Sequence, residues 1–224
     1  MSTYKALRKN PSAPQVSEVL IAALREIPVA ALSDNMHRNI GTVGLRPYHR
    51  PGKHTMAGTA VTARSRGGDN LTYLRALEFC RPGDVLIIDA GGHLDNAVVG
   101  GILSFYAASI GVAGLVIDGA IRDVAEIRER EFPVYARGVT HRGPYKDGPG
   151  EINVPVSVGG MVINPGDIVV GDQDGLLAIP PGEAEVVLDG ARTTLANEAN
   201  TIRAMKEGRW DRSFIDALEA RCNN

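Results

Sequence analysis

The chain has 224 residues, of which 44% are hydrophobic and 22% are charged, a composition typical of a globular protein that buries a core without disulfides. Its 24 basic and 26 acidic residues leave a net charge of −2, which argues against a nucleic-acid partner. No run approaches the ~18 apolar residues of a membrane helix, so we expect no membrane partner. The first residues lack the apolar core of a secretory signal, and Cys80 and Cys222 are far apart, so we expect a reduced, cytoplasmic protein.

Hydrophobic spacing predicts three helices and one strand in the first third of the chain. The helices are expected at 17–27, 29–37 and 70–79, where apolar residues recur every three or four positions. Residues 56–66 alternate between two sets of side chains, which is typical of a strand.

The centre of the chain alternates between apolar runs and helical patterns. Strands are expected at 84–89, 112–118 and 133–137, with helices at 101–110 and 121–130 between them. Such an order predicts parallel strands buried on both faces and joined by right-handed crossovers. Asp89 and Asp118 close the first two strands, at the end where ligands bind in open α/β sheets.

After Gly138 the pattern changes to short β segments separated by turn residues. These segments are expected at 152–158, 161–163, 168–171 and 176–179, and helices are expected at 182–207 and 214–221. With no internal repeat or linker, residues 1–224 are expected to form a single domain with a core at about 17–208 and a helical extension at 209–224.

The first candidate site is the sequence DGAIRD at 118–123, where a strand ends and a helix begins. Arg122 could bind a carboxylate or keto oxygen, and Asp123 could supply a hard oxygen to Mg²⁺ or Mn²⁺. The structural alternative is that Asp123 is only an acid at the start of a helix, where it is favourable on electrostatic grounds.

The second candidate site lies between two glycine pairs, at 91–92 and 100–101. The free N–H groups of Gly101, Ile102 and Leu103 at a helix start would form an anion site, although glycines also occur in tight loops for conformational reasons alone. His93 could act as a base, and His141 with Arg142 could contact an anion, but solvated surface roles are the more frequent reading. Neither a dinucleotide-binding glycine motif, a P-loop nor a nucleophile elbow occurs.

Four motifs together resemble the RraA-like family over about residues 17–208. They are GGHLDNAVVGGIL at 91–103, GLVIDGAIRD at 114–123, FPVYARG at 132–138 and NPGDIVVGDQDG at 164–175. The resemblance implies an α/β fold of the phosphohistidine-swivelling type, an α/β/β sandwich with a central, mostly parallel sheet and a long C-terminal helix. It also implies a homotrimer or a dimer of trimers with active sites at subunit boundaries.

The family includes class II pyruvate aldolases, and the resemblance carries their site residues to this chain. Backbone amides at the helix start would hold the pyruvate carboxylate, Arg122 would bind the pyruvyl part, and Asp123 would ligate Mg²⁺ or Mn²⁺. A neighbouring subunit would contribute Glu198 from the long helix. The amides in question belong to Gly100, Gly101, Ile102 and Leu103.

The resemblance therefore implies a metal-dependent lyase with a 2-oxo acid as its small-molecule substrate. Expected substrates are 4-hydroxy-4-methyl-2-oxoglutarate, 4-carboxy-4-hydroxy-2-oxoadipate and oxaloacetate, since aldol cleavage and decarboxylation both leave the enolate of pyruvate. Many aldolases of the family have an acid where this chain has Gly101; Asp89 is a possible substitute.

The sequence leaves two alternatives to a metal-dependent lyase. One is a non-catalytic regulator of ribonuclease E activity, a branch of the family that lacks the aspartate corresponding to Asp123. The other is an enzyme of the same scaffold that acts on another 2-oxo acid, a choice that fold analogy cannot make.

Overall fold

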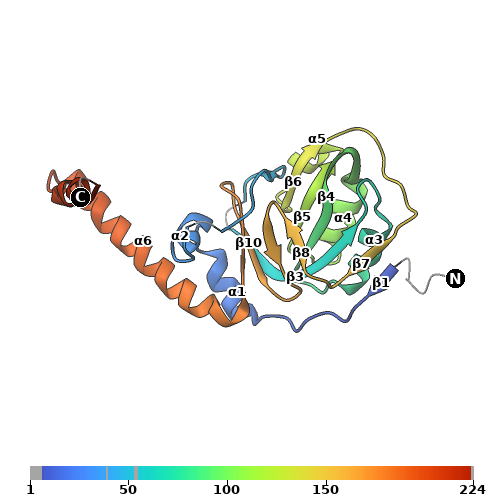
Figure 1. Ribbon diagram of the computed structural model, residues 1–224, viewed down its shortest axis with the longest axis horizontal. Coiled ribbons are helices and arrows are strands. Elements are labelled where there is room, and N and C mark those ends of the chain that lie inside the picture. The colour runs from blue at the N-terminus through green and yellow to red at the C-terminus, as the bar shows by residue number, and fades with distance from the viewer. Residues whose placement is uncertain (1–6, 39, 53–54, 223–224) are drawn as a thin grey trace.

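The computed structural model describes residues 7–38, 40–52 and 55–222. Its centre is a sheet in which four parallel strands lie side by side: β3 (Met56–Ser65), β4 (Asp84–Val99), β5 (Gly114–Ile121) and β6 (Val134–Val139). The expected mixed α/β fold with a central, mostly parallel sheet is thus confirmed (Figure 1).

Shorter strands extend this sheet at both edges. β2 (Arg46–Pro47) pairs antiparallel with β6, and β7 (Gly150–Ile152) pairs antiparallel with β3 and parallel with β1 (Leu7–Lys9). β10 (Ile168–Gly171) joins the other half of β3 and pairs with β11 (Leu176–Ile179). A separate hairpin consists of β8 (Val156–Val158) and β9 (Met161–Ile163).

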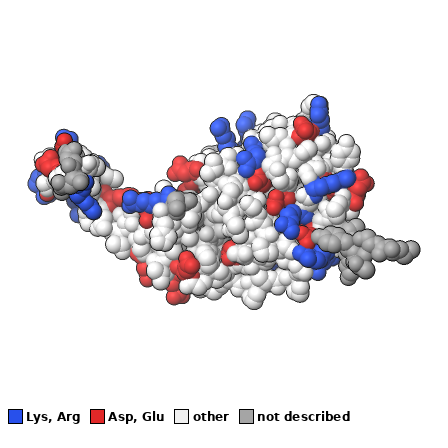
Figure 2. Space-filling model, in the orientation of Figure 1, with Lys and Arg blue, Asp and Glu red and all other residues white. Residues whose placement is uncertain are grey.

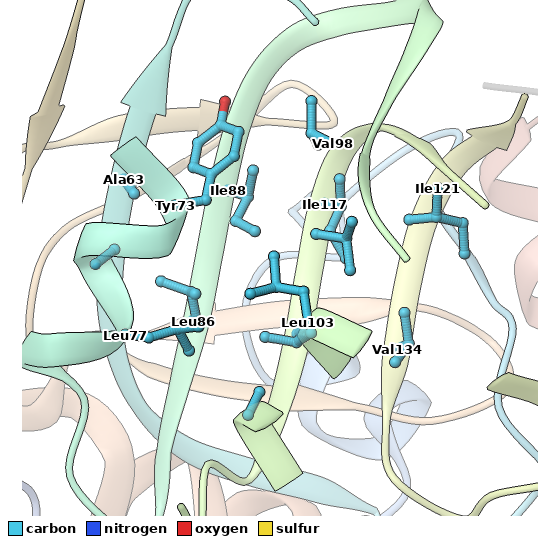
Figure 3. Close-up of a cluster of buried hydrophobic side chains, with 14 of the residues drawn as sticks. Ala63, Tyr73, Leu77, Leu86, Ile88, Val98, Leu103, Ile117, Ile121 and Val134 are labelled. Carbon is cyan, nitrogen blue, oxygen red and sulfur yellow. The ribbon is translucent and has the colours of Figure 1, made fainter. Parts of the chain in front are cut away.

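Helices cover one face of the parallel strands. They are α3 (Leu71–Ala76), the 3₁₀ turn η1 (Leu77–Phe79), α4 (Gly101–Ser109) and α5 (Val124–Arg128). Figure 3 shows Leu103 of α4 and Tyr73 of α3 beside Leu86, Ile88 and Ile117 of the sheet. The opposite face packs through Ile87 and its neighbours against the β8–β9 hairpin.

A third group of helices packs on β10 and β11. It comprises α1 (Glu18–Arg25), α2 (Val29–Asp34) and the first turns of α6 (Ala184–Lys206), which follows the 3₁₀ turn η2 (Pro181–Glu183). The remainder of α6 projects from the body and carries α7 (Ser213–Cys222) at its far end (Figure 1). The expected long C-terminal helix is therefore present. No helix among the described residues is long and apolar enough to span a bilayer.

Several predicted boundaries are wrong, most of them in the centre of the chain. The strand predicted at 84–89 continues to Val99, because Gly91 and Gly92 adopt φ +64° and +71° and redirect the strand rather than end it. The helix predicted at 121–130 is only α5, because residues 119–121 extend β5 and are buried. The strand predicted at 152–158 is divided at Asn153, which has φ +55°.

Candidate functional site

Asp123 lies where β5 passes into α5. It is the N-cap of α5 in the left-handed conformation (φ +60°, ψ +35°), yet its side chain makes no capping bond to its own helix. Instead its Oδ2 accepts a hydrogen bond of 2.9 Å from the N–H of Gly101, the first residue of α4. A left-handed aspartate costs on the order of 1 kcal/mol. Asp123 is therefore an acid at a helix start, as predicted, but its carboxylate binds the first N–H of the neighbouring helix α4.

Gly100 makes this arrangement possible for steric reasons. Its φ of −140° and ψ of −169° are open to any residue. A Cβ at this position, however, would lie 2.5 Å from Oδ2 of Asp123 and 3.1 Å from Cγ of Arg122. The missing side chain leaves the space in which the acid and the arginine approach the start of α4.

Arg122 precedes Asp123 and is fixed by its backbone. Its N–H donates to the carbonyl of Val99 at 3.0 Å, which ties the end of β5 to the end of β4. The guanidinium Nε lies 3.7 Å from Oδ2 of Asp123, and both side chains are a little over two-fifths exposed. Arginine, aspartate and the start of α4 therefore form one compact group that a ligand can reach.

These residues line a cavity of about 260 Å³. Its polar lining comes from Asn70, Arg122, Asp123 and Lys146, together with the backbone of Gly100. Apolar side chains complete the walls, among them Leu74, Val98, Val99, Ile102, Leu103 and Tyr106. A small cavity of this composition suits a small organic anion rather than a nucleotide or a polymer.

The backbone amides at the start of α4 are not equivalent. The N–H of Gly101 is bonded to Asp123. The N–H groups of Ile102 and Leu103 lie in the first turn, where a helix offers no internal acceptor, and they have no partner among the described residues. Of the predicted anion-binding amides, those of Ile102 and Leu103 are therefore free, and that of Gly101 orients the carboxylate.

The fit of a divalent cation depends on Asp123. The described part of the chain contains no group of three or more His, Cys, Asp or Glu residues that could hold a metal. Mg²⁺ commonly binds through one or two carboxylates, with water and substrate oxygens as its other ligands. Asp123, with one oxygen turned to Gly101 and space made by Gly100, fits that mode as a single protein ligand.

Other predicted residues lie outside the cavity. Asp118 is buried, forms an ion pair with the partly exposed Arg137 and accepts the N–H of Gly159 at 2.8 Å. Asp89 accepts the N–H of Gly91 at 3.0 Å. Both acids thus organise the sheet and the β8–β9 hairpin, so the suggested substitution of Asp89 for an acid at position 101 has no support here.

The predicted histidines and Glu198 are also separate from the cavity lining. His93 packs against Gly67 and approaches Asn96, and His141 and Arg142 are exposed. Glu198 lies on the exposed half of α6, in a shallow depression of that helix. Sequence reasoning missed Asn70 and Lys146; the only signal for Lys146 was its place in a glycine- and proline-rich loop.

Together, the fold and the cavity define an α/β protein with a site for a small anion at the ends of adjacent parallel strands. The sequence profile of the RraA-like family, described as Aldolase/RraA, matches residues 29–178. This chain belongs to the RraA-like family.

Known proteins similar to this chain carry two kinds of name. A Halalkalibacterium halodurans protein, 39% identical over 84% of this chain and 89% of its own length, carries the provisional name 4-hydroxy-4-methyl-2-oxoglutarate aldolase. A Thermus thermophilus protein named 4-hydroxy-4-methyl-2-oxoglutarate aldolase is 40% identical over 50% of this chain and 68% of its own. The structure of Streptomyces coelicolor RraAS2, described as an unusual member of the RNase ES inhibitor RraA family, has a TM-score of 0.75 at 28% identity, covering 84% and 97% of the two chains.

Proposed function

We propose that this protein is a divalent-metal-dependent carbon–carbon lyase that releases pyruvate from a 2-oxo acid. The proposed substrates are 4-hydroxy-4-methyl-2-oxoglutarate, 4-carboxy-4-hydroxy-2-oxoadipate and oxaloacetate. The observation that carries the proposal is the placement of Arg122, Asp123 and the free amides of α4 in one small cavity. The aldolase names of two relatives support the same class of reaction.

Each part of the site has a role in this proposal. The N–H groups of Ile102 and Leu103 bind the carboxylate of the pyruvyl part, helped by the positive end of α4. Arg122 places a fixed cation beside the keto oxygen, where negative charge grows as the carbon–carbon bond breaks. Asp123 would hold Mg²⁺ or Mn²⁺, which would supply Lewis-acid stabilisation of that charge.

Assembly is part of the proposal. Ile102 and Phe105 on α4 are 87% and 60% exposed beside the cavity, an apolar surface that favours contact with another subunit. We propose a homotrimer or a dimer of trimers in which Glu198 from the neighbouring subunit approaches the site. The phosphohistidine-swivelling assignment, the single domain over residues 1–224 and the cytoplasmic location belong to the same proposal.

The second candidate function is a non-catalytic regulator of an RNase, which the likeness to RraAS2 favours. Acidic and basic residues are interspersed on the face seen in Figure 2. The presence of Asp123 beside Arg122 in a small cavity favours the lyase, because this arrangement places a carboxylate for a metal next to a cation for a 2-oxo acid.

The deciding experiment measures pyruvate release from oxaloacetate and from 4-hydroxy-4-methyl-2-oxoglutarate, with Mg²⁺ and with EDTA. We expect turnover above the rate of the metal alone, lost with EDTA and lost in Asp123→Ala. Arg122→Ala should raise KM and lower kcat together. Asp174→Ala, at an exposed aspartate outside the cavity, is the matched control. Full activity in Asp123→Ala would refute the metal site. No turnover of either acid by folded wild-type protein would favour first an enzyme that acts on another 2-oxo acid and then the regulator.

A further inference from the structure

We propose that Asn96 is a positioning residue that keeps the Arg122–Asp123 pair open, so that both charged groups stay available to a ligand. Asn96 is not part of the cavity lining. It acts through the loop at residues 142–148, which packs against Arg122. The inference rests on the proposed function only in taking Arg122 and Asp123 as the groups that bind the ligand.

The Arg122–Asp123 pair is wider than a hydrogen-bonded ion pair. Nε of Arg122 lies 3.7 Å from Oδ2 of Asp123, whereas a charged N–H and a carboxylate oxygen in a hydrogen bond are about 2.8 Å apart. The guanidinium makes no hydrogen bond to any of the described residues. Because arginine carries five donors in a geometry that matches a carboxylate, the surroundings have to hold the two groups apart.

Each member of the pair is held by a different glycine. Oδ2 of Asp123 accepts the N–H of Gly101 at 2.9 Å, which fixes the carboxylate at the start of α4. Gly143 lies against the guanidinium, since a Cβ at this position would be 3.1 Å from Nη1 of Arg122. That separation is shorter than an ordinary van der Waals contact. The backbone of Gly143 is therefore the surface on which the guanidinium rests.

Asn96 fastens Gly143 to the end of β4. Its Nδ2 donates to the carbonyl of Gly143 at 2.7 Å, which is a short and well-formed hydrogen bond. The next residue adds a backbone bond, because the N–H of Ala97 donates to the carbonyl of Arg142 at 2.9 Å. Of these two bonds only the first uses a side chain, so Asn96 is the position at which a substitution can release Gly143.

The orientation of Asn96 is supported from its other side. Nε2 of His93 lies 3.4 Å from Oδ1 of Asn96, a long contact that matches an amide whose nitrogen already donates to Gly143. Gly68 makes room for both side chains, since a Cβ there would lie 3.0 Å from Nε2 of His93 and 3.1 Å from Cβ of Asn96. His93, which the sequence suggested as a base, thus packs behind Asn96.

The far end of the loop is fixed independently of Asn96. Asp69 is fully buried, and its Oδ2 accepts the N–H groups of Asp147 and Gly148 at 2.6 and 2.9 Å. Burial opposes its ionisation, but these backbone bonds and a nearby arginine outweigh that effect and lower the pKa of Asp69. Loss of the Asn96 bond should therefore free Gly143 without detaching the rest of the loop.

Closure of the pair would remove both of its groups from use. An arginine donor on the carboxylate of Asp123 would compete with a cation, and the same donor would be lost to an oxyanion. Both side chains are a little over two-fifths exposed, and an exposed ion pair gains little from closing. We therefore expect an effect of about three- to fivefold on ligand affinity.

The direct test compares crystal structures of the wild type and Asn96→Ala. We expect the Nε–Oδ2 separation of 3.7 Å to shorten to about 2.8 Å in the variant. Asn96→Gln, which keeps an amide donor, should restore part of the opening. Asn200→Ala, at an exposed asparagine on α6, is the matched control. A separation that is the same in the wild type and Asn96→Ala would overturn the inference.

A double-mutant cycle separates positioning from general loosening of the loop. Asn96→Ala should lower Mn²⁺ affinity, measured by calorimetry, about three- to fivefold. In an Arg122→Ala background the same change should have no effect, because no guanidinium remains to close on Asp123. Equal losses in the two backgrounds would refute the positioning role.

These readouts also distinguish the inference from the proposed function. The separation of Arg122 and Asp123 is measured without substrate or turnover. A pair that closes in Asn96→Ala, in a protein that releases no pyruvate, would support the inference and refute the lyase. Pyruvate release with an unchanged pair in Asn96→Ala would support the lyase and overturn the inference.

Discussion

Replacing Gly100 by alanine tests whether Asp123 and Arg122 act as one unit. The backbone at Gly100 is extended, so alanine adds no conformational strain. The new Cβ would lie 2.5 Å from Asp123 Oδ2, well inside van der Waals contact, and the carboxylate would have to leave the N–H of Gly101. We expect a folded protein with a displaced acid.

The size of the effect follows from that one hydrogen bond. Bonds between a charged and a neutral group contribute about 1.5–3 kcal/mol, and the lower end applies because the Asp123 side chain is 44% exposed. A loss of about 1.5 kcal/mol corresponds to a roughly tenfold decrease in Mn²⁺ affinity. The assay is Mn²⁺ affinity by calorimetry, together with kcat/KM for pyruvate release.

The control for Gly100→Ala is Gly182→Ala. A Cβ at Gly182 would meet no atom within 4 Å, so this variant adds the same methyl group without a clash. Gly100→Ala protein with wild-type Tm, Mn²⁺ affinity and turnover would refute the argument that the acid and the helix start form one unit.

Two further predictions concern buried carboxylates. Asp69→Asn should lower the free energy of unfolding by about 2 kcal/mol at pH 7. The pKa of Asp69 is lower in the folded protein than in the unfolded chain. The stability that the Asp69 carboxylate contributes is therefore present above the unfolded pKa and is lost as pH falls through the folded pKa. The deficit measured by urea unfolding should therefore narrow from pH 7 towards pH 3, and a constant deficit would contradict this linkage. Asp118→Ala should lower the free energy of unfolding by about 3 kcal/mol or more, because Arg137 would remain without its carboxylate and the Gly159 amide without its acceptor. A decrease below about 1 kcal/mol would show that water already screens the Asp118–Arg137 pair.

Local hydrophobic patterns were enough to predict most of the fold. The run at 85–88 and the run at 115–117 are apolar throughout, and both are fully buried in the parallel sheet. The helix pattern at 101–110 is also confirmed as α4. These elements were predictable because each depends on its own residues and on burial alone.

The wrong boundaries share a cause that local patterns do not contain. Residues 90–99 mix glycine, charged and polar side chains, and they form a strand only because residues 119–121 pair with them. The β1 and β2 strands, which the sequence reading missed, likewise exist through partners, at Gly150–Ile152 and at Tyr135–Ala136. Long-range pairing decides these segments.

The residues of the candidate site divide in the same way, into those that local patterns predict and those that depend on long-range contacts. Arg122 and Asp123 were predictable because they follow directly on a buried strand. Asn70 and Lys146 were not, since the contact between their segments depends on Asp69 reaching across to residues 147 and 148.

The space available at Gly101 also depends on a neighbouring element, the helix α5. A side chain at position 101 would overlap the carboxylate of Glu126 on α5, which packs directly against this glycine. Glu126 in turn pairs with Arg130, whose guanidinium lies 5.1 Å from the ring centroid of Phe105 on α4. The absence of an acid at position 101 is therefore coupled to the packing of α5 on α4. The Glu126 side chain is half-exposed, so an acidic side chain introduced at position 101 has to move the Glu126 carboxylate away from α4 and thereby disturbs its pairing with Arg130.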